Sequence, residues 1–507
     1  MCELLPGMQT WEDFVAAVVG FGSPLRSPLH KLPAYVEKGI QLRARLSVGD
    51  AARYRQDMVR RIVHLAEVDG PSESPRWGLL QRLGEAAGHP DKRLAMDAAE
   101  PDGFRLLGKL APNMGWPPRD VRAMPFSQGE HQAARGRILE AHRSERSRGY
   151  YRLPSKHADA LYEMLQAQAE KGYWEEFSIK EADQKFGGFA AWLFFAVEEQ
   201  GQNGEIKLRG CLSPESANDP DMVVLPDHVY MAGLDGYLAM CSKLSETLAA
   251  AGRTPPLEGW KEDYVDGFRQ LPLASQDRCM LCALGRSPSG DIRVFAPSRL
   301  LFGPRGGPHV FCRVTDMVAA ICSVLLLAPT TPHVDDMCGV EEEGGADSAR
   351  RAVLALHSAL NLELKVSKAV PPRELQRGAS RLVVLGGDVD FSSTCADRKA
   401  GLVAQVDVPA EKAEKYRRQI TSTLTAGRLT PAGRLERLSA AGTLLLQWHW
   451  AALAGLSLGP SGRGLGRVLV SRSRQCCVLR TLASASSSVH QAKSMSAALR
   501  RFPGARL

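Results

Sequence analysis

Two adjacent carboxylates, Asp335 and Asp336, closely follow the longest apolar run of the chain, Met317 to Ala328, beyond a Pro-Thr-Thr-Pro break. The run is shorter than the roughly 18 residues that a membrane span needs, so it predicts a buried helix. Neighbouring carboxylates repel each other unless water or a cation neutralises them. The pair is therefore either an ordinary exposed turn or part of a divalent-metal site, and the residues themselves leave both interpretations open.

The segments around this pair alternate between strand-like and helix-like patterns. We expect strands in EIKLRGCL, MVVLPDHVY, DIRVFAPSRLLFG and RLVVLGGDV, and helices in VTDMVAAICSVLLLA, at 51–66 and at about 346–360. The order of strand, helix, acidic turn, helix and strand predicts an antiparallel sheet with helices on one face. Between residues 131 and 200 the amphipathic patterns instead predict surface helices of an all-α piece.

A further carboxylate, Asp263, lies about 70 residues before the acidic pair, in KEDYVDGFRQLPL. The alternation across Tyr264, Val265 and Asp266 predicts that Asp263 stands at the end of a strand. Phosphoryl transfer with two divalent ions needs oxygen ligands from separate elements of a fold. Asp263, Asp335 and Asp336 are therefore candidates for such a site.

The resemblance to a known family rests on blocks in a fixed order: DYVDGFRQLPL, LLFGPRGGPHVFCRV, HVDDM, NLELKVSKAVPP and VVLGGDVDF. In this order they resemble the palm motifs of reverse transcriptases, especially those of retroelements with a tyrosine-recombinase or related organisation. The match covers roughly residues 204–391. Each block alone also suits a core aromatic, a surface charge or a simple turn, so its place in the series carries the specificity. The resemblance implies an α+β right-hand polymerase with fingers, an antiparallel-sheet palm and a helical thumb.

The resemblance also implies roles for individual residues. Asp263, Asp335 and Asp336 would be the catalytic ligands of Mg²⁺ or Mn²⁺. The residues that would contact the incoming nucleotide are Lys207, Arg209, Phe268, Phe302, Gly303 and Lys368, and those of the primer grip are Leu385 and Gly386. The sequence departs from the family in His333, which replaces the usual Tyr, and in Gly267, which replaces a more usual Ala and is expected to loosen the strand beside Phe268.

The activity implied by the family is RNA-directed DNA synthesis, in which a primer 3′-hydroxyl attacks a dNTP on an RNA or DNA template. The alternative is an inactive or domesticated retroelement product that only binds nucleic acid. His333 motivates it, as does the end of the chain, which resembles neither an RNase H nor an integrase. A two-metal nuclease is disfavoured because no His or Glu cluster accompanies the aspartates. The GPRGGP stretch lacks the Gly-Lys-Ser/Thr of a P-loop.

The family pattern and the breaks along the chain predict a domain order. We expect a mainly helical N-terminal region over 1–130, fingers and palm over 131–398, a helical thumb-like region over 399–455, and a basic, poorly ordered tail over 456–507. The net charge is +8, and about nine Lys or Arg but no Asp or Glu follow Ala451. This segment could attract a phosphate backbone or simply be a solvated end.

The cysteines and the N-terminus bear on the compartment. There are 11 cysteines at irregular spacing, and no secretory pattern begins the chain. We therefore expect an intracellular protein, in the cytoplasm or nucleus, without a membrane partner. Cys279 and Cys282 form a CxxC, but no second pair follows at zinc-ribbon spacing, which favours ordinary thiols.

Overall fold

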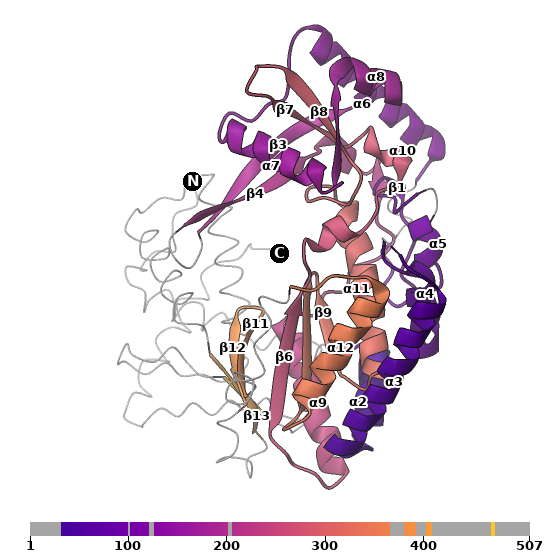
Figure 1. Cartoon of the computed structure of the whole chain (residues 1–507), viewed down its shortest axis with the longest axis vertical. Helices are drawn as coiled ribbons and strands as arrows, with labels where there is room; N and C mark the ends of the chain where they lie inside the picture. Colours follow the sequence, from indigo (N-terminus) through magenta and orange to yellow (C-terminus); the bar gives the residue numbers. More distant parts are fainter. Residues whose placement is uncertain are drawn as a thin grey trace, which may run out of the picture. The chain divides into compact units, whose positions relative to one another are not determined.

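The computed structural model describes residues 32–72, 74–99, 102–120, 126–200, 205–365, 380–391, 402–407 and 468–471. The chain divides into two compact units, one formed by residues 26–398 and the other by residues 1–25 with 399–507. The described residues form a mixed α+β structure with several sheets (Figure 1). None of the helices in these ranges is long and apolar enough to cross a membrane.

A three-stranded antiparallel sheet carries the acidic residues. Its strands are β6 (Leu257–Asp263), β9 (Thr330–His333) and β10 (Asp336–Glu342), in the order β6-β10-β9. Helices α9 (Leu234–Ala250), α11 (Gly306–Val324) and α12 (Ala346–Leu360) pack against it (Figure 1). An antiparallel sheet with an acidic turn is present as predicted, but the strands expected in DIRVFAPSRLLFG and RLVVLGGDV belong to other sheets. Helix α12 has the predicted bounds.

Helix α11 is buried from His309 to Val324, as the apolar run predicts, although it ends before Ala328. Its polar side chains bond to the N-terminal region. The Asp316 carboxylate accepts hydrogen bonds from the Tyr35 hydroxyl at 2.5 Å and the Trp116 indole at 3.0 Å. Because a buried carboxylate is stable only with such donors, these bonds fix the N-terminal segment against α11.

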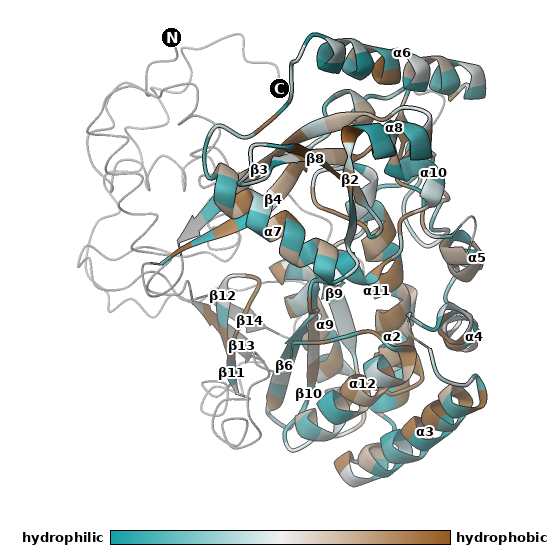
Figure 2. Cartoon of the chain, turned by 45° about the horizontal axis from the view of Figure 1, so that its top comes forward, coloured by the Kyte–Doolittle hydropathy of each residue, from teal (hydrophilic) through white to brown (hydrophobic). Residues whose placement is uncertain are grey.

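The described residues of the N-terminal segment are mainly helical. Its helices are α2 (Ala34–Arg43), α3 (Val48–Val68), α4 (Trp77–Ala87) and α5 (Leu94–Ala99). Helices α2 and α4 pack on α11, and α3 packs on α12. The segment is therefore part of the same compact unit as the three-stranded sheet. Figure 2 shows hydrophilic and hydrophobic residues mixed along α3 and α12, as on helices with one face in water.

Buried ion pairs reinforce this packing. The Arg43 guanidinium contacts Glu341 at 2.8 Å and Glu342 at 2.7 Å, and Arg55 also bonds to Glu341. Arg43, Arg55 and Glu341 are almost completely buried. Both glutamates belong to β10, so the network links α2 and α3 to the far end of the sheet from the aspartates.

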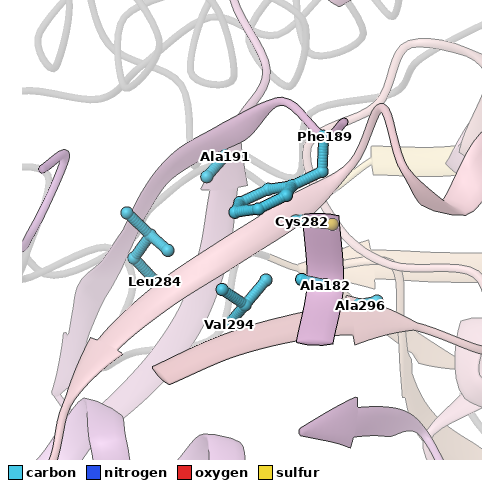
Figure 3. Packing of buried hydrophobic residues seen from close by; sticks show 7 residues of the cluster. All are labelled: Ala182, Phe189, Ala191, Cys282, Leu284, Val294 and Ala296. Carbon is cyan, nitrogen blue, oxygen red and sulfur yellow. The ribbon is translucent and has the colours of Figure 1, made fainter. Parts of the chain in front are cut away.

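A five-stranded sheet lies in the same unit, in the order β2-β8-β7-β3-β4. Its strands are β2 (Trp174–Ser178), β3 (Ala191–Gln200), β4 (Ile206–Ser213), β7 (Cys282–Arg286) and β8 (Ile292–Pro297). Helices α6 (Gln128–Ser147), α7 (Ala158–Glu170) and α8 (Ile179–Phe186) accompany it. Figure 3 shows part of its core, where Phe189 lies among Ala191, Cys282, Leu284 and Val294.

This sheet corrects the prediction of an all-α piece between residues 131 and 200. Helices α6 and α7 are present, but β2 and β3 occupy much of the rest. Strand β3 begins with the run AWLFFAV, in which Ala191, Trp192 and Phe194 are buried, and its partners β4 and β7 lie later in the chain. A continuous apolar run of this kind fits a buried strand as well as a helix, so its period could not decide between them.

The last described elements differ from the expected pattern in two places. RLVVLGGDV is not one strand but a hairpin of β11 (Arg381–Val384) and β12 (Gly387–Asp390). In the second unit, β13 (Leu402–Asp407) pairs antiparallel with β14 (Val468–Ser471), where a helical thumb and an unordered tail were expected. The rest of those two predicted regions lies outside the described residues.

The expected strand in MVVLPDHVY is also shorter than predicted. This segment contributes only the two-residue strand β5 (Val223–Val224), which pairs with β1 (Gly108–Lys109).

Candidate active site

The three predicted aspartates lie together at one end of the three-stranded sheet. Strand β6 ends at Asp263, β10 begins at Asp336, and these two residues are direct partners in the antiparallel ladder. Residues that face each other in this way carry their side chains on the same face of a sheet. Asp335 lies in the turn between β9 and β10, and its carbonyl accepts a hydrogen bond from the Tyr264 amide at 3.2 Å.

The carboxylates share one region of negative charge. Burial raises the pKa of Asp335 above its ordinary value, and the nearby charges of Asp263 and Asp336 raise it further. Carboxylate oxygens from separate elements are the ligands that Mg²⁺ and Mn²⁺ prefer. In its chemistry, therefore, this donor set is of the kind that divalent cations prefer.

Two lysines that the sequence analysis did not identify also belong to the cluster. The Lys365 ammonium lies 3.0 Å from Asp263 Oδ2, and the Lys261 ammonium lies 2.9 Å from Asp336 Oδ2. Within the described ranges, no group of three or more His, Cys, Asp or Glu side chains is arranged to hold a metal ion. Two of the three carboxylates bond instead to ammonium groups.

The turn that presents Asp335 has an unusual backbone. Val334 has a φ of 54°, in the left-handed region that β-branched residues rarely enter. Such a conformation costs about 1–3 kcal/mol, and residues in it cluster at functional sites. His333, at the end of β9, places its Nδ1 atom 2.9 Å from the Ala232 carbonyl oxygen. The ring of His333 is therefore held by a contact with the segment before α9.

The predicted nucleotide-binding aromatics, Phe268 and Phe302, contact each other, and Phe268 also stacks on Phe311. Phe268 is 4% exposed and its ring lies 4.8 Å from that of Phe311, nearly parallel to it. Phe302, which is 44% exposed, lies 4.8 Å from Phe268 on a tilted ring plane. Gly267 begins a 3₁₀ turn rather than lying in a strand, so the expected loosening of a strand is wrong. A Cβ atom there would come within 2.8 Å of the Phe311 ring.

Gly303 is fixed by its surroundings. Its φ is 121°, and a Cβ atom would lie 2.0 Å from the Leu212 carbonyl oxygen of β4. The Leu212 amide also donates to the Phe302 carbonyl at 3.1 Å. The loop that carries Phe302 therefore lies directly against β4, and only glycine fits at this approach.

Gly303→Ala is expected to lower the free energy of unfolding by at least about 2 kcal/mol, because both the backbone conformation and the contact with Leu212 oppose a Cβ atom. Urea denaturation followed by circular dichroism measures the change. Gly136→Ala is the matched control, since Gly136 lies in α6 with open space around it. That change should be neutral or stabilising by up to about 1 kcal/mol. Equal stabilities of the two variants would contradict the expectation.

The other predicted site residues lie on separate elements. Lys207 and Arg209 are exposed on β4, an edge strand of the five-stranded sheet. Leu385 and Gly386 form the turn of the β11–β12 hairpin, with φ values of 49° and 85°. A two-residue hairpin turn with both residues at positive φ is of type I′. Lys368 lies outside the described residues. The roles that the family resemblance implies for these residues remain predictions.

A buried histidine supports the strand end next to Asp263. His357 Nδ1 donates to the Val353 carbonyl at 2.8 Å, and Nε2 accepts from the Tyr264 hydroxyl at 2.9 Å. This arrangement requires a neutral ring, and burial lowers the pKa of His357 from 6.5 to about 4. An unfolded chain would bind a proton at this residue well before the folded chain does.

The contribution of His357 to stability is therefore full above pH 6.5 and is lost as the pH falls toward 4. Since one pH unit corresponds to about 1.4 kcal/mol, the loss approaches about 3 kcal/mol. The free energy of unfolding measured by urea at pH 7 and pH 4.5 should differ less in His357→Gln than in the wild type. The exposed His64, in α3, offers the control His64→Gln, which should leave the pH difference unchanged. An equal pH difference in all three proteins would refute the assignment.

Comparisons with known proteins give limited likenesses. No protein-family model matches the chain, and no curated protein matches it. Similar solved structures include a foamy viral protease-reverse transcriptase dRH in complex with double-stranded DNA, with 14% identity, a TM-score of 0.36, and coverage of 59% of this chain and 45% of that one. Another is the prototype foamy virus protease-reverse transcriptase, with 12% identity, a TM-score of 0.30 and coverage of 46% and 26%. The chain spans less than half the length of either protein, and scores this low do not establish a shared fold.

Proposed function

We propose that this chain is a reverse-transcriptase-like polymerase that joins dNTPs to a primer 3′-hydroxyl on an RNA or DNA template. The observation that carries the proposal is the position of Asp263, Asp335 and Asp336 at one end of the antiparallel sheet, on elements that follow the order of the family motifs. The three-stranded sheet would be the palm, and the five-stranded sheet would belong to the fingers.

The chain's own residues would divide the work as follows. Asp263 and Asp336 present oxygens from neighbouring strands, and Asp335 adds a third carboxylate from the strained turn. Bound Mg²⁺ or Mn²⁺ would supply activation of the attacking hydroxyl and neutralisation of phosphate charge. Lys207 and Arg209, exposed on β4, would bind the triphosphate by charge-assisted hydrogen bonds. The template would be held through its backbone, which makes its affinity salt-dependent.

Primer extension tests the proposal directly. The purified full chain should incorporate dNTPs into a labelled primer on an RNA or a DNA template, and the reaction should require Mg²⁺ or Mn²⁺ and stop when EDTA is added. Extended products resolved on a denaturing gel are the measurement. If neither template supports extension with either metal, the chain is not a polymerase.

One observation favours a second function. Because lysine ammonium groups bond to Asp263 and Asp336, the cluster could be retained as part of a fold that only binds nucleic acid. Such a protein would bind RNA with an affinity that falls steeply with salt, would incorporate no dNTP, and would bind equally well after Asp263→Asn. Filter binding and primer extension on the same preparation separate the two functions.

A further inference from the structure

Lys261 and Lys365 reach the acidic cluster from separate segments of the chain. Lys261 lies two residues before Asp263 on β6, so both side chains are on one face. Asp336 on β10 is directly opposite Asp263 and diagonal to Lys261. Lys365 follows α12, and its amide donates to the Asp263 carbonyl at 2.7 Å. That backbone bond fixes the start of the Lys365 side chain beside the carboxylate that its ammonium contacts. The backbone therefore places both lysines beside the aspartates that their ammonium groups contact.

Each of these ion pairs sits at the border of the solvent. The side chains of Lys261 and Lys365 are both 32% exposed, whereas that of Asp263 is only 8% exposed and that of Asp336 is 23% exposed. A lysine ammonium is a compact, strongly hydrated charge on a flexible stem, so it can leave a carboxylate for water at small cost. The backbone of Asp263 and Asp336 is held by the antiparallel ladder, so both carboxylates stay at the end of the sheet.

We propose that Lys261 and Lys365 act as displaceable counter-cations of the site, a role that rests on the proposed two-metal function. Each ammonium bonds to a carboxylate oxygen that a divalent cation would also use. Metal ions therefore bind in competition with the two lysines, which lower the affinity of the site for metal. In return, the lysines neutralise the repulsion among the three carboxylates when divalent ions are scarce. The two lysines are positioning residues and contact no substrate.

Direct measurement of Mn²⁺ binding tests this role without any catalytic readout. Free Mn²⁺ can be followed by electron paramagnetic resonance during titration of the full chain. Lys365→Met and Lys261→Met should each tighten Mn²⁺ binding by about tenfold, since each removes a competing charge-assisted hydrogen bond of modest net strength. Lys365→Arg and Lys261→Arg keep the charge and should bind Mn²⁺ as the wild type does.

The matched control is Lys171→Met. The Lys171 ammonium lies 3.7 Å from Asp266, an aspartate near the cluster but outside it, and its side chain is 61% exposed. Its loss should leave Mn²⁺ affinity unchanged. Urea denaturation of every variant confirms that the fold is retained. If a Met variant does not fold, Lys365→Gln or Lys261→Gln, which also removes the charge, takes its place and should likewise tighten Mn²⁺ binding.

The outcomes separate this inference from the proposed function. Unchanged or weaker Mn²⁺ binding in both Met variants overturns the role of the lysines, as does the absence of saturable binding in every protein. If the wild type nevertheless extends primers, the polymerase proposal is retained and only the role of the lysines is rejected. If Mn²⁺ binding tightens but no protein extends a primer, the lysines act as proposed and the polymerase activity is refuted.

Discussion

Asp335→Asn is expected to lower the rate of primer extension by at least about a thousandfold, while the protein remains folded. Removal of one charged ligand costs several kcal/mol of transition-state stabilisation, and about 4 kcal/mol corresponds to a thousandfold. The effect on stability should have the opposite sign. Burial and the charges of Asp263 and Asp336 raise the pKa of Asp335, which means that its ionised form is disfavoured in the folded state. A neutral amide at this position should therefore make the protein at least as stable at pH 7.

Single-turnover primer extension and urea denaturation of the same preparation measure both effects. Asp266→Asn is the matched control, because Asp266 lies in the same motif but its carboxylate is exposed and 3.7 Å from Lys171. Its extension rate should stay within a few-fold of the wild type. If Asp335→Asn extends primers as fast as the control, the acidic cluster is not the catalytic site.

Glu341→Ala is expected to lower the free energy of unfolding by about 3–5 kcal/mol, the largest stability change that we anticipate in this chain. Its carboxylate bonds to both Arg43 and Arg55, and all three side chains are buried. Alanine would leave Arg55 without its carboxylate partner and Arg43 with Glu342 alone. Burial already lowers the pKa of Arg55, which shows how unfavourable its charge is in this environment.

The midpoint of urea denaturation measures this change. Glu343→Ala, two residues along the chain and exposed, should alter the free energy of unfolding by no more than about 0.5 kcal/mol. Addition of Arg55→Met to Glu341→Ala should restore part of the lost stability, because it removes the uncompensated charge. A loss below about 1 kcal/mol for Glu341→Ala, or no recovery in the double variant, would contradict the buried network as the cause.

The sequence predicted those parts of the fold where local pattern and long-range packing agree. The amphipathic repeat of α12 runs without a break from the first residue of the helix to the last, so both ends could be predicted from the local sequence. The apolar character of α11 predicted its burial for the same reason. The run that begins β3 offered no such agreement, because a buried strand and a buried helix share its composition. The turn of the β11–β12 hairpin was missed because its first residue is Leu385 rather than the Asn or Gly that such turns favour.

In the candidate site, too, some contacts could be predicted from the local sequence and others depend on long-range packing. The meeting of Asp263 with Asp336 could be expected from the motif order, since adjacent antiparallel strands bring their ends together. Lys261 could also have been found, because residues two apart in a strand share a face. Lys365 could not, since its place depends on a bridge between Tyr264 and Leu364 that closes across all of α11, β9, β10 and α12. The network around Glu341 was equally hidden, because nothing local links it to Arg43.

The separation of Arg43 and Glu341 along the chain, 298 residues, also shapes how the protein is made. At roughly 5–20 residues per second, a ribosome would finish α2 and α3 about 15–60 seconds before it delivers the carboxylates that neutralise them. During this interval the two helices have no buried site to enter, and their arginines stay hydrated. Helices α2 and α3 therefore cannot complete their packing until β10 emerges, so the final assembly of this unit waits for a contact between residues far apart in the chain.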